Sequence, residues 1–466
     1  MKMNRNALPF IFLMIFIGAE LYAQQPDGKK PNIVFILADD LGYFDLSCYG
    51  NPYNNTPNID RLATDGLLFK QAYVASPVCS PSRAAILTAK HPARLHLTNF
   101  LVGNKVDSAS RVLPAKWRPY LPGTEITLAE HLKALGYRTG MVGKWHLGYT
   151  DSTNAVAQGF DYDRVIGKNG LDYYNYGITS KNRIVFEDTG TYYLTDRLTD
   201  YGVEFIKGSK AEPFFLFLSY SAPHVFIVPR GDKLRKYFLA YNKHDGKYNP
   251  YYAAMLESLD DGVGRILETL ATLGLEENTL VVFTSDNGGV GLPELGPMPT
   301  NMEPLRAWKG HVYEGGIRIP LLIKWPGHIR SGGVTENYIT GTDYLPTFME
   351  ILGKPIPYRI DGMSFLGTLY HPEVSFNRGP VFWHYPHFSN QEGRPAGALR
   401  LGDYKLIENY ETGELSLYNL KDDISEEHDL GKRLPEKRDE LLALFTAWKK
   451  ETDANMPIPN PNFKEK

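Results

Sequence analysis

Residues 31–40 read PNIVFILADD, an apolar run that begins after a proline and ends in two aspartates. A short run with no polar interruption, such as residues 33–38, is typical of a strand buried on both faces of a parallel sheet. Open α/β sheets bind their ligands beyond the carboxyl ends of such strands. Asp39 and Asp40 therefore indicate where a functional site should lie.

The same pattern of an apolar run followed by polar residues recurs along the chain. It is found at 140–146, 214–224 and 280–287, and the series closes with a run at 320–324. We expect each run to be another strand of the same sheet, with its polar residues at the strand end.

Two helical patterns lie between these runs. Thr127 precedes apolar residues at helical spacing, and Glu130 follows three positions later, which is the signature of a capping box. Residues 251–273 alternate apolar and charged positions as a long amphipathic helix does. Strands that alternate with helices predict an α/β fold with a large, mainly parallel sheet flanked by helices.

The pattern changes after about residue 370. Four short segments have strand character and are separated by turns: 381–383, 397–401, 404–408 and 415–420. Residues 435–450 then read as a helix, and 456–466 as a proline-rich tail. We expect a catalytic α/β domain at 31–370 and a C-terminal subdomain at 371–466, made of a small antiparallel sheet and a helix.

The N-terminus has the order of a secretory signal peptide. Lys2 and Arg5 precede an apolar stretch at 7–19, and small residues lead up to Ala23. The apolar stretch is shorter than the roughly 20 residues of a membrane-spanning helix. We expect residues 1–23 to be removed and the protein to be exported to the periplasm or the extracellular medium, with no membrane insertion after cleavage.

Composition excludes some classes of function. Net charge is −3 and hydrophobic residues make up 43% of the chain, so neither a nucleic-acid surface nor extensive disorder is expected. Cys48 and Cys79 are the two cysteines, and in an exported protein they could form a disulfide. The sequence around Cys79 argues for a chemical role instead, and Cys48 reads as a small buried residue.

Two groups of polar residues follow the predicted strands. Carboxylate and amide oxygens, which suit Ca²⁺ or Mg²⁺ better than zinc, come from Asp39, Asp40, Asp286 and Asn287. Cationic and proton-transferring groups come from Lys144, His146, His224 and Lys309. A divalent cation beside such groups is suited to a tetrahedral oxyanion such as phosphate or sulfate.

The segment VCSPSRAAILT at 78–88 distinguishes between those anions. It has the character of a helix start, and a helix N-terminus favours anions. Cys-Ser-Pro-Ser-Arg followed by Leu-Thr resembles the maturation signature of the type I sulfatases, within the alkaline phosphatase superfamily. The resemblance implies that Cys79 is oxidised to the nucleophile Cα-formylglycine, by a formylglycine-generating or an anaerobic sulfatase-maturating enzyme. It also implies that Arg83 holds this residue.

Most of the mature chain, from about 31 to 450, resembles this family. The segments that match, in family order, are 31–42, 56–63, 140–148, 223–224, 284–288, 309–320 and 343–347. The resemblance implies one Ca²⁺ ion, in preference to Mg²⁺, with residue 79 joining the oxygen ligands. One departure is Ala89, which stands where the family usually has a glycine that aids recognition by the maturation enzyme.

The family mechanism assigns a role to each remaining polar residue. His224 would donate a proton to the departing alcohol, and His146 would remove a proton from the hydrated aldehyde. Lys144 and Lys309 would hold sulfate oxygens.

We expect the substrate to be a sulfated saccharide, with a galacto-configured or fucosyl sugar favoured. The signal-peptide junction resembles those of glycan-degrading Bacteroidetes, whose sulfatases act on polysaccharide fragments. Candidate sugar contacts, each of which could equally be structural, are Arg94, His96, Asn99, His311, Trp383, His384 and His387.

Two alternatives stay open at this point. A phosphodiesterase or phosphonate monoester hydrolase of the same superfamily can also use formylglycine. A non-catalytic protein that binds sulfated glycans on the same fold would need missing site residues, whereas every expected position is filled.

Overall fold

In the computed structural model the segment quoted first forms strand β1 (Asn32–Ala38), and all seven of its residues are buried. Successive side chains point to opposite faces of the strand. Phe35 accordingly belongs to one hydrophobic cluster and Ile36 to another. The strand is covered on both faces, as its apolar run predicts.

The structure describes residues 29–101, 103, 110–167, 172–241, 247–291 and 298–464. The expected signal peptide, 1–23, lies outside these ranges. Within them, no helix has both the length and the apolar character needed to cross a bilayer.

Eleven strands of the described residues form one sheet, in the order β11-β2-β10-β9-β1-β8-β4-β5-β6-β7, with β12 also paired to β2. Their bounds are β1 Asn32–Ala38, β2 Leu67–Tyr73, β4 Arg138–Gly143, β5 Tyr162–Ile166, β6 Asn175–Ser180, β7 Arg183–Thr189, β8 Phe214–Ser219, β9 Thr279–Ser285, β10 Arg318–Lys324, β11 Gly333–Thr335 and β12 Ile339–Thr340.

The centre of this sheet is parallel. Strands β9, β1, β8, β4 and β5 lie next to one another in this order and are mutually parallel. Strand β10 runs antiparallel to both β9 and β2. At the other edge β6 and β7 form an antiparallel hairpin. The predicted, mainly parallel sheet is confirmed, and the apolar run at 320–324 proves to be part of an antiparallel strand.

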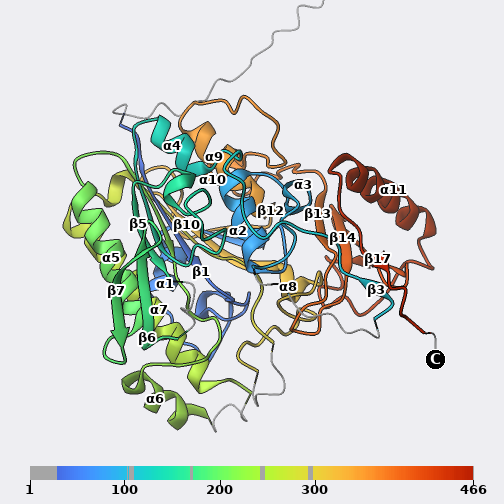
Figure 1. Cartoon of the computed structure of the whole chain (residues 1–466), viewed down its shortest axis with the longest axis horizontal. Helices are drawn as coiled ribbons and strands as arrows, with labels where there is room; N and C mark the ends of the chain where they lie inside the picture. Colours follow the sequence, from blue (N-terminus) through green and yellow to red (C-terminus); the bar gives the residue numbers. More distant parts are fainter. Residues whose placement is uncertain are drawn as a thin grey trace, which may run out of the picture. The chain divides into compact units, whose positions relative to one another are not determined.

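Helices cover both faces of the sheet (Figure 1). Side chains of α1, α5 and α7 pack into one hydrophobic cluster, and side chains of α2, α4 and α9 pack into the cluster on the opposite face. The predicted capping box is present at the start of α4, where Thr127 and Glu130 each bind the other's backbone N–H. The helix bounds are α1 Pro57–Asp65, α2 Cys79–Thr88, α3 Pro92–Leu95, α4 Leu128–Ala134, α5 Leu194–Ser209, α6 Gly231–Tyr241, α7 Pro250–Thr272, α8 Glu314–Ile317, α9 Tyr344–Ile351, α10 Leu366–Tyr370 and α11 Pro435–Glu451.

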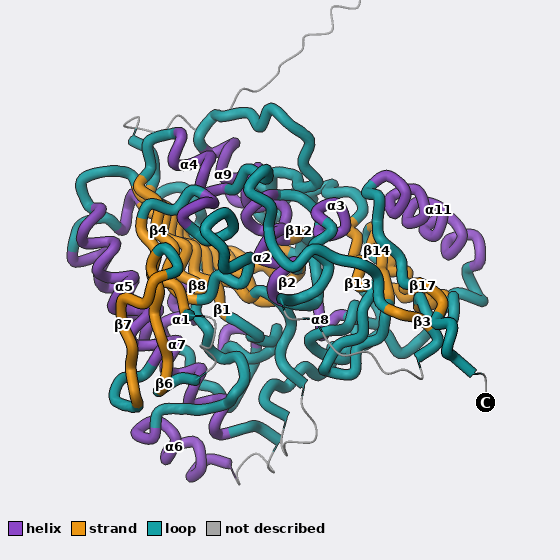
Figure 2. The backbone as a smooth tube through the Cα atoms, viewed as in Figure 1, coloured by secondary structure: helices purple, strands orange, loops and turns teal. Residues whose placement is uncertain are grey.

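A second, antiparallel sheet follows in the C-terminal part of the chain (Figure 2). Its strands pair in sequence order: β13 Val381–Tyr385, β14 Ala396–Leu401, β15 Tyr404–Asn409 and β16 Leu415–Asn419. Helix α11 packs on this sheet through Leu441 and Phe445. The small antiparallel sheet with its helix is therefore confirmed. A two-stranded ribbon joins β3 (Val112–Leu113) to β17 (Ile458–Pro459).

A buried ion-pair network connects the second sheet to the first. Lys405 of β15 lies 2.9 Å from Glu314 of α8 and 2.8 Å from Glu426, and all three side chains are fully buried. Burial alone would raise the pKa of Glu314, but the charges of Lys405, Arg318 and Arg400 together lower it to about 2. Burial raises the pKa of Glu426 to about 7. These ion pairs cross the expected domain boundary near residue 370. Separating the two parts would leave buried charges without partners, which is energetically costly.

Candidate active site

The polar ends of four adjacent parallel strands meet at one edge of the sheet. Strands β9, β1, β8 and β4 are consecutive neighbours. The site residues that follow them are Asp286 and Asn287 after β9, Asp39 and Asp40 after β1, His224 after β8, and Lys144 and His146 after β4. The sequence-based expectation that the strand ends converge agrees with this arrangement.

Helix α2 places Arg83 at the same edge of the sheet, beside the carboxyl ends of these strands. The Arg83 Nη2 atom lies 2.7 Å from Asp286 Oδ2, and Nη1 donates to the Lys144 carbonyl (2.6 Å) and to Ser219 Oγ (2.5 Å). The guanidinium is 1% exposed. Arg83 therefore ties the helix to the ends of three strands. Ser219, the last residue of an apolar strand, is a partner that the sequence patterns did not single out.

Cys79 begins α2 and faces His146. The distance from Cys79 Sγ to His146 Nδ1 is 3.2 Å, and the cysteine is 2% exposed. Burial raises the pKa of the Cys79 thiol, and burial together with Lys144 holds the pKa of His146 well below 6.5. The backbone of His146 has φ +57°, in the left-handed region that costs energy for a residue with a Cβ. The fold thus holds a neutral imidazole against residue 79.

Two lysines pair with the two aspartates after β1. Lys144 Nζ lies 2.5 Å from Asp39 Oδ2, and Lys309 Nζ lies 2.6 Å from Asp40 Oδ1. Burial alone would raise the pKa of Asp39, but Lys144 and the other nearby cations outweigh it and lower that pKa. The Asp39 carboxylate is therefore held in its charged form although it is inaccessible to water.

Several oxygen atoms in this cluster are buried without a hydrogen-bond partner. They are Asp39 Oδ1, Asp40 Oδ2 and Asn287 Oδ1. Unpaired buried acceptors are costly, and three of them from two strand ends are explained by a cation that they would share. Burial and the Asp39 charge also raise the pKa of Asp286 to about 7, so the crowded carboxylates need further positive charge. The residues present fit a hard divalent cation.

His224 lies beside the same oxygens. Its Nδ1 is 2.5 Å from the Val225 carbonyl, so Nδ1 carries a proton, and its Nε2 lies 3.6 Å from Asp40 Oδ2. The ligand atoms of Asp39, Asp40 and His224 all lie within 4.8 Å of one another. Burial lowers the pKa of His224, although the Asp40 carboxylate opposes that shift. In neutral His224, Nε2 and Asp40 Oδ2 are both acceptors and repel each other. A proton on Nε2, or a metal ion between the two atoms, would remove this repulsion.

A further set of contacts shapes the loop after β1. Asp40 has φ +66°, and the next amide, that of Leu41, donates to Ser285 Oγ (3.0 Å). Asp45 Oδ2 accepts from the Gly42 amide (2.7 Å) and the Tyr252 hydroxyl (2.6 Å). These supporting residues escaped sequence reasoning, because a lone Asp or Tyr inside a helix or turn carries no distinctive pattern.

Two further residues singled out in the sequence are Cys48 and Ala89. Cys48 forms no disulfide with Cys79, and it is partly exposed, not buried as expected. Ala89 caps the end of α2 with φ +55°, a conformation that glycine adopts without strain. Its carbonyl accepts the amides of Asp361 (2.8 Å) and Gly362 (3.2 Å). A left-handed helix end therefore explains why glycine suits this position.

The candidate sugar contacts are engaged by protein groups. Trp383 Nε1 donates to the Val74 carbonyl (2.7 Å), and Trp383 and His384 are both fully buried. The other contacts are Arg94 with Asp361 and Glu451, His96 with Asn455, Asn99 with Phe100 and Tyr385, His311 with Trp308, His384 with Tyr410 and Asn455, and His387 with Thr98. Because Trp383 and His384 have no polar atom left for a ligand, these contacts give no support to their assignment as sugar-binding residues, which stays a prediction.

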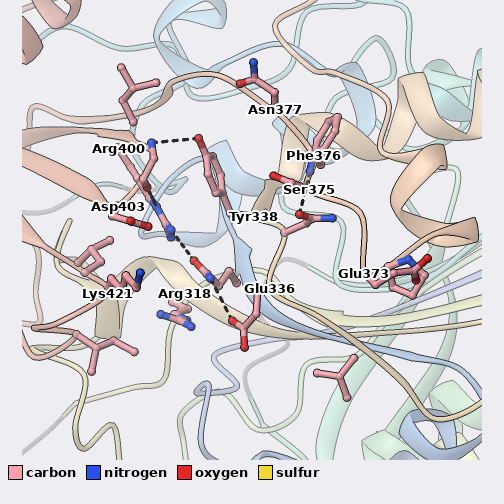
Figure 3. Close-up of a pocket in the computed structure, with 18 residues that line it drawn as sticks. Arg318, Glu336, Tyr338, Glu373, Ser375, Phe376, Asn377, Arg400, Asp403 and Lys421 are labelled. Carbon is pink, nitrogen blue, oxygen red and sulfur yellow. Dashed lines mark hydrogen bonds between the residues drawn. The ribbon is translucent and has the colours of Figure 1, made fainter.

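A large cleft lies away from these residues, at the seam between the two sheets (Figure 3). It has a volume of about 1040 Å³, and Arg400, Tyr338 and Glu336 are among its lining residues. Two of its charged groups are bound to Gln71, because Arg400 donates to Gln71 (2.5 Å) and Gln71 donates to Glu336 (3.2 Å). No member of the strand-end site lines it.

Comparison with known proteins identifies the family. Residues 31–354 match the Sulfatase family model, and residues 307–442 match the model of the N-sulphoglucosamine sulphohydrolase C-terminal region. The chain is 32% identical to a sulfatase of Formosa agariphila, over 95% of this chain and 92% of that protein. It is 34% identical to N-acetylgalactosamine-6-sulfatase of Rattus norvegicus, over 81% of this chain and 71% of that protein.

A solved structure agrees with these relatives. The crystal structure of Ps i-CgsB in complex with k-i-k-neocarrahexaose superposes with a TM-score of 0.77 and 29% identity, covering 90% of this chain and 93% of that one. The family model alone covers well over half of the chain. On the sequence signature, the fold and these similarities, the protein belongs to the sulfatase family and is a sulfuric ester hydrolase.

Proposed function

We propose that this enzyme removes sulfate from a sulfated saccharide, with Cα-formylglycine at position 79 and one Ca²⁺ ion at the strand-end oxygens. The observation that carries the proposal is the position of Cys79 Sγ, 3.2 Å from His146 Nδ1 and within electrostatic reach of the buried side chains of Lys144, Lys309 and Arg83. As its hydrate, formylglycine supplies an oxygen nucleophile, and calcium supplies positive charge that favours its ionised form.

The proposed metal ligands are Asp39, Asp40, Asp286 and Asn287, together with residue 79. The buried, unpaired oxygens of three of them support this set. Their oxygen chemistry favours calcium over zinc, and His224 stays available for another role.

Arg83, Lys144 and Lys309 would hold the sulfate. Each is at most 9% exposed, so its charge acts where water does not screen it. Both lysines lie against carboxylates through a terminal amine with three N–H groups. They can therefore keep their carboxylate contact and donate to sulfate oxygens as negative charge moves to the departing oxygen.

The two histidines would carry protons in opposite directions. His146 is neutral and adjacent to residue 79, which suits it to accept a proton from that residue. His224 would donate from Nε2 to the departing alcohol, and the Asp40 carboxylate 3.6 Å away favours its protonated form. Neutral His224 carries its single proton on Nδ1 and has none on Nε2 to donate. Donation from Nε2 would therefore require the doubly protonated imidazolium.

The substrate is a sulfated sugar in this proposal, and a galacto-configured sugar is favoured. One relative is named N-acetylgalactosamine-6-sulfatase, and a similar structure contains k-i-k-neocarrahexaose. We further propose export after removal of residues 1–23, and oxidation of Cys79 by a formylglycine-generating or anaerobic sulfatase-maturating enzyme.

A comparison of sulfate esters with phosphate esters of the same alcohol tests the proposed function. Nitrophenyl sulfate, the corresponding phosphate monoester and diester, and 6-sulfated N-acetylgalactosamine would be assayed with the wild type and with Cys79→Ala. We expect turnover of the sulfates to exceed that of the phosphates and to disappear in the variant. Preferred turnover of a phosphate or phosphonate ester would favour the phosphodiesterase or phosphonate hydrolase alternative.

A further inference from the structure

A second cleft lies between the loop after β4 and the β6–β7 hairpin. It has a volume of about 740 Å³, and its lining includes Tyr149, Asp172, Asn175, Glu187 and Asp188. We call it the hairpin cleft. The hairpin forms the end of the sheet in the order β4-β5-β6-β7, and Figure 2 shows it standing out beside α5.

One wall of the hairpin cleft belongs to the loop that carries a proposed catalytic residue. Tyr149 follows His146 by three residues, so their Cα atoms are at most about 11 Å apart. The Tyr149 side chain is 38% exposed, which leaves part of its ring open to a ligand. Burial raises the pKa of Tyr149, and the charge of Lys144, a residue of the site, opposes that shift.

The opposite wall is attached to the loop of the other histidine. Tyr173, next to Asp172, donates its hydroxyl to the carbonyls of Ser221 (2.8 Å) and His224 (2.9 Å). Tyr173 is 1% exposed, so this anchor is protected from water. The hairpin cleft is therefore held at a fixed position relative to the group that would protonate the departing alcohol.

The hairpin cleft is acidic, whereas the sulfate site combines three cationic side chains with three carboxylates and the proposed calcium. Among the described residues that line the hairpin cleft are three carboxylates, of Asp172, Glu187 and Asp188, and no lysine or arginine. Asp172 and Glu187 are exposed, whereas Asp188 is buried and its Oδ1 accepts three backbone amides. Carboxylates and the Asn175 amide bind hydroxyl groups, and an aromatic ring packs against the apolar face of a sugar.

We propose that the hairpin cleft binds the sugar next to the sulfated one, and that its carboxylates select for an unsulfated sugar at that position. This inference rests on the proposed function. The cationic site around residue 79 attracts one sulfate, and a second sulfate in the hairpin cleft would face only like charge. The enzyme would thus act on singly sulfated disaccharide units in preference to doubly sulfated ones.

The test uses two disaccharides that differ only by a sulfate on the second sugar, and a sulfated monosaccharide as reference. For the wild type, kcat/KM should be at least tenfold higher for the singly sulfated disaccharide at low ionic strength, and 0.5 M salt should reduce this ratio because it screens the repulsion. In the double variant Asp172→Asn and Glu187→Gln, the ratio should fall at least threefold. Tyr149→Ala should raise KM for the singly sulfated disaccharide more than kcat falls.

Glu277→Gln is the matched control. It removes one exposed carboxylate just before the start of β9, at the end of that strand opposite to Asp286, and should leave the ratio unchanged. Equal kcat/KM for the two disaccharides, or a ratio that the double variant does not alter, would overturn the inference. If the monosaccharide sulfate is not hydrolysed either, the proposed function fails first, and the two failures are thereby distinguished.

Discussion

Arg83 and Asp286 form an ion pair that is inaccessible to solvent. Both Nε (2.8 Å) and Nη2 (2.7 Å) of the arginine approach one carboxylate oxygen, Oδ2, and the other oxygen, Oδ1, lies 3.3 Å from the Asp40 amide. The pair therefore joins the nucleophile helix to the ends of β9 and β1. A single side chain serves both the fold and the proposed sulfate site.

Removal of this arginine should destabilise the protein as well as inactivate it. Arg83→Ala leaves Asp286 buried without its partner, which costs about 3–5 kcal/mol of unfolding free energy. Arg83→Lys keeps the charge but loses the planar donor set, so we expect a smaller loss of stability and still no measurable turnover. Urea unfolding followed by circular dichroism, together with sulfatase assays, separates the two effects. Wild-type stability of Arg83→Ala would contradict the structural role.

Calcium should stabilise the wild type through the unpaired oxygens. Calcium at one hundred times its Kd should add about 2.7 kcal/mol to the unfolding free energy, and EDTA should remove that gain. Asp39→Asn keeps the shape of the ligand but reduces its charge, so the gain should become much smaller. Thermal unfolding with calcium, magnesium or EDTA measures this. An equal calcium effect in both proteins would place the ion elsewhere.

Residue 79 should lack a thiol in protein from a host that oxidises it. Peptide mass spectrometry should find an aldehyde or its hydrate at this position, and chelation of calcium should not alter that result. Cys79→Ser should fold normally, since the side chains are similar in size, but should lose turnover. A peptide with only intact cysteine, from an active preparation, would disprove the formylglycine assignment.

Stability should depend on pH through buried histidines of the second sheet. Burial lowers the pKa of His384 to about 3, against 6.5 when exposed. Below pH 6.5 the unfolded chain therefore binds a proton that the folded chain does not, and stability falls as pH falls. His384→Gln should make the unfolding free energy less dependent on pH between 6.5 and 5, by up to about 1.4 kcal/mol per pH unit.

The matched control for this experiment is His371→Gln, because that side chain is 68% exposed. Its unfolding free energy, measured by urea titration at pH 7.5 and 5.0, should change with pH as the wild type does. A pH dependence in His384→Gln that equals or exceeds that of the wild type would refute the assignment.

Ala89→Gly should affect maturation more than stability. Alanine in the left-handed conformation costs about 1–2 kcal/mol, and glycine removes that cost. Glycine also loses the burial of one methyl group, which contributes about 0.8 kcal/mol to stability. The unfolding free energy should therefore change little. We expect the converted fraction of residue 79, measured by mass spectrometry, to rise, whereas an unchanged fraction would show that the maturation enzyme accepts alanine.

Much of the fold could be predicted because its central strands are wholly apolar. The runs around Phe35 and Leu216 are unbroken, and polar residues follow each directly, so both the strand and its functional end are visible in the sequence. The edge strands carry no such signal. In β7 most residues are exposed and the pattern is mixed, so the β6–β7 hairpin and the cleft beside it were not predicted.

The same contrast holds for the site. Asp40 and Lys309 could be predicted because each sits in a distinctive motif, and their pairing at 2.6 Å then follows from the sheet. The sugar contacts were placed on residues such as Trp383 because aromatic and cationic side chains commonly bind sugars. Composition alone does not show whether an indole faces solvent, and this one donates its N–H to a backbone carbonyl in the core.

All ten residues of α2 are buried, and this has a consequence for the order of events in the cell. A second protein cannot reach a side chain enclosed on every side, so any enzyme that oxidises Cys79 must meet the chain while this segment is still extended. Oxidation of residue 79 would then have to come before collapse of the core. Once the sheet has closed over residue 79, a molecule that missed its modification would stay inactive for its lifetime.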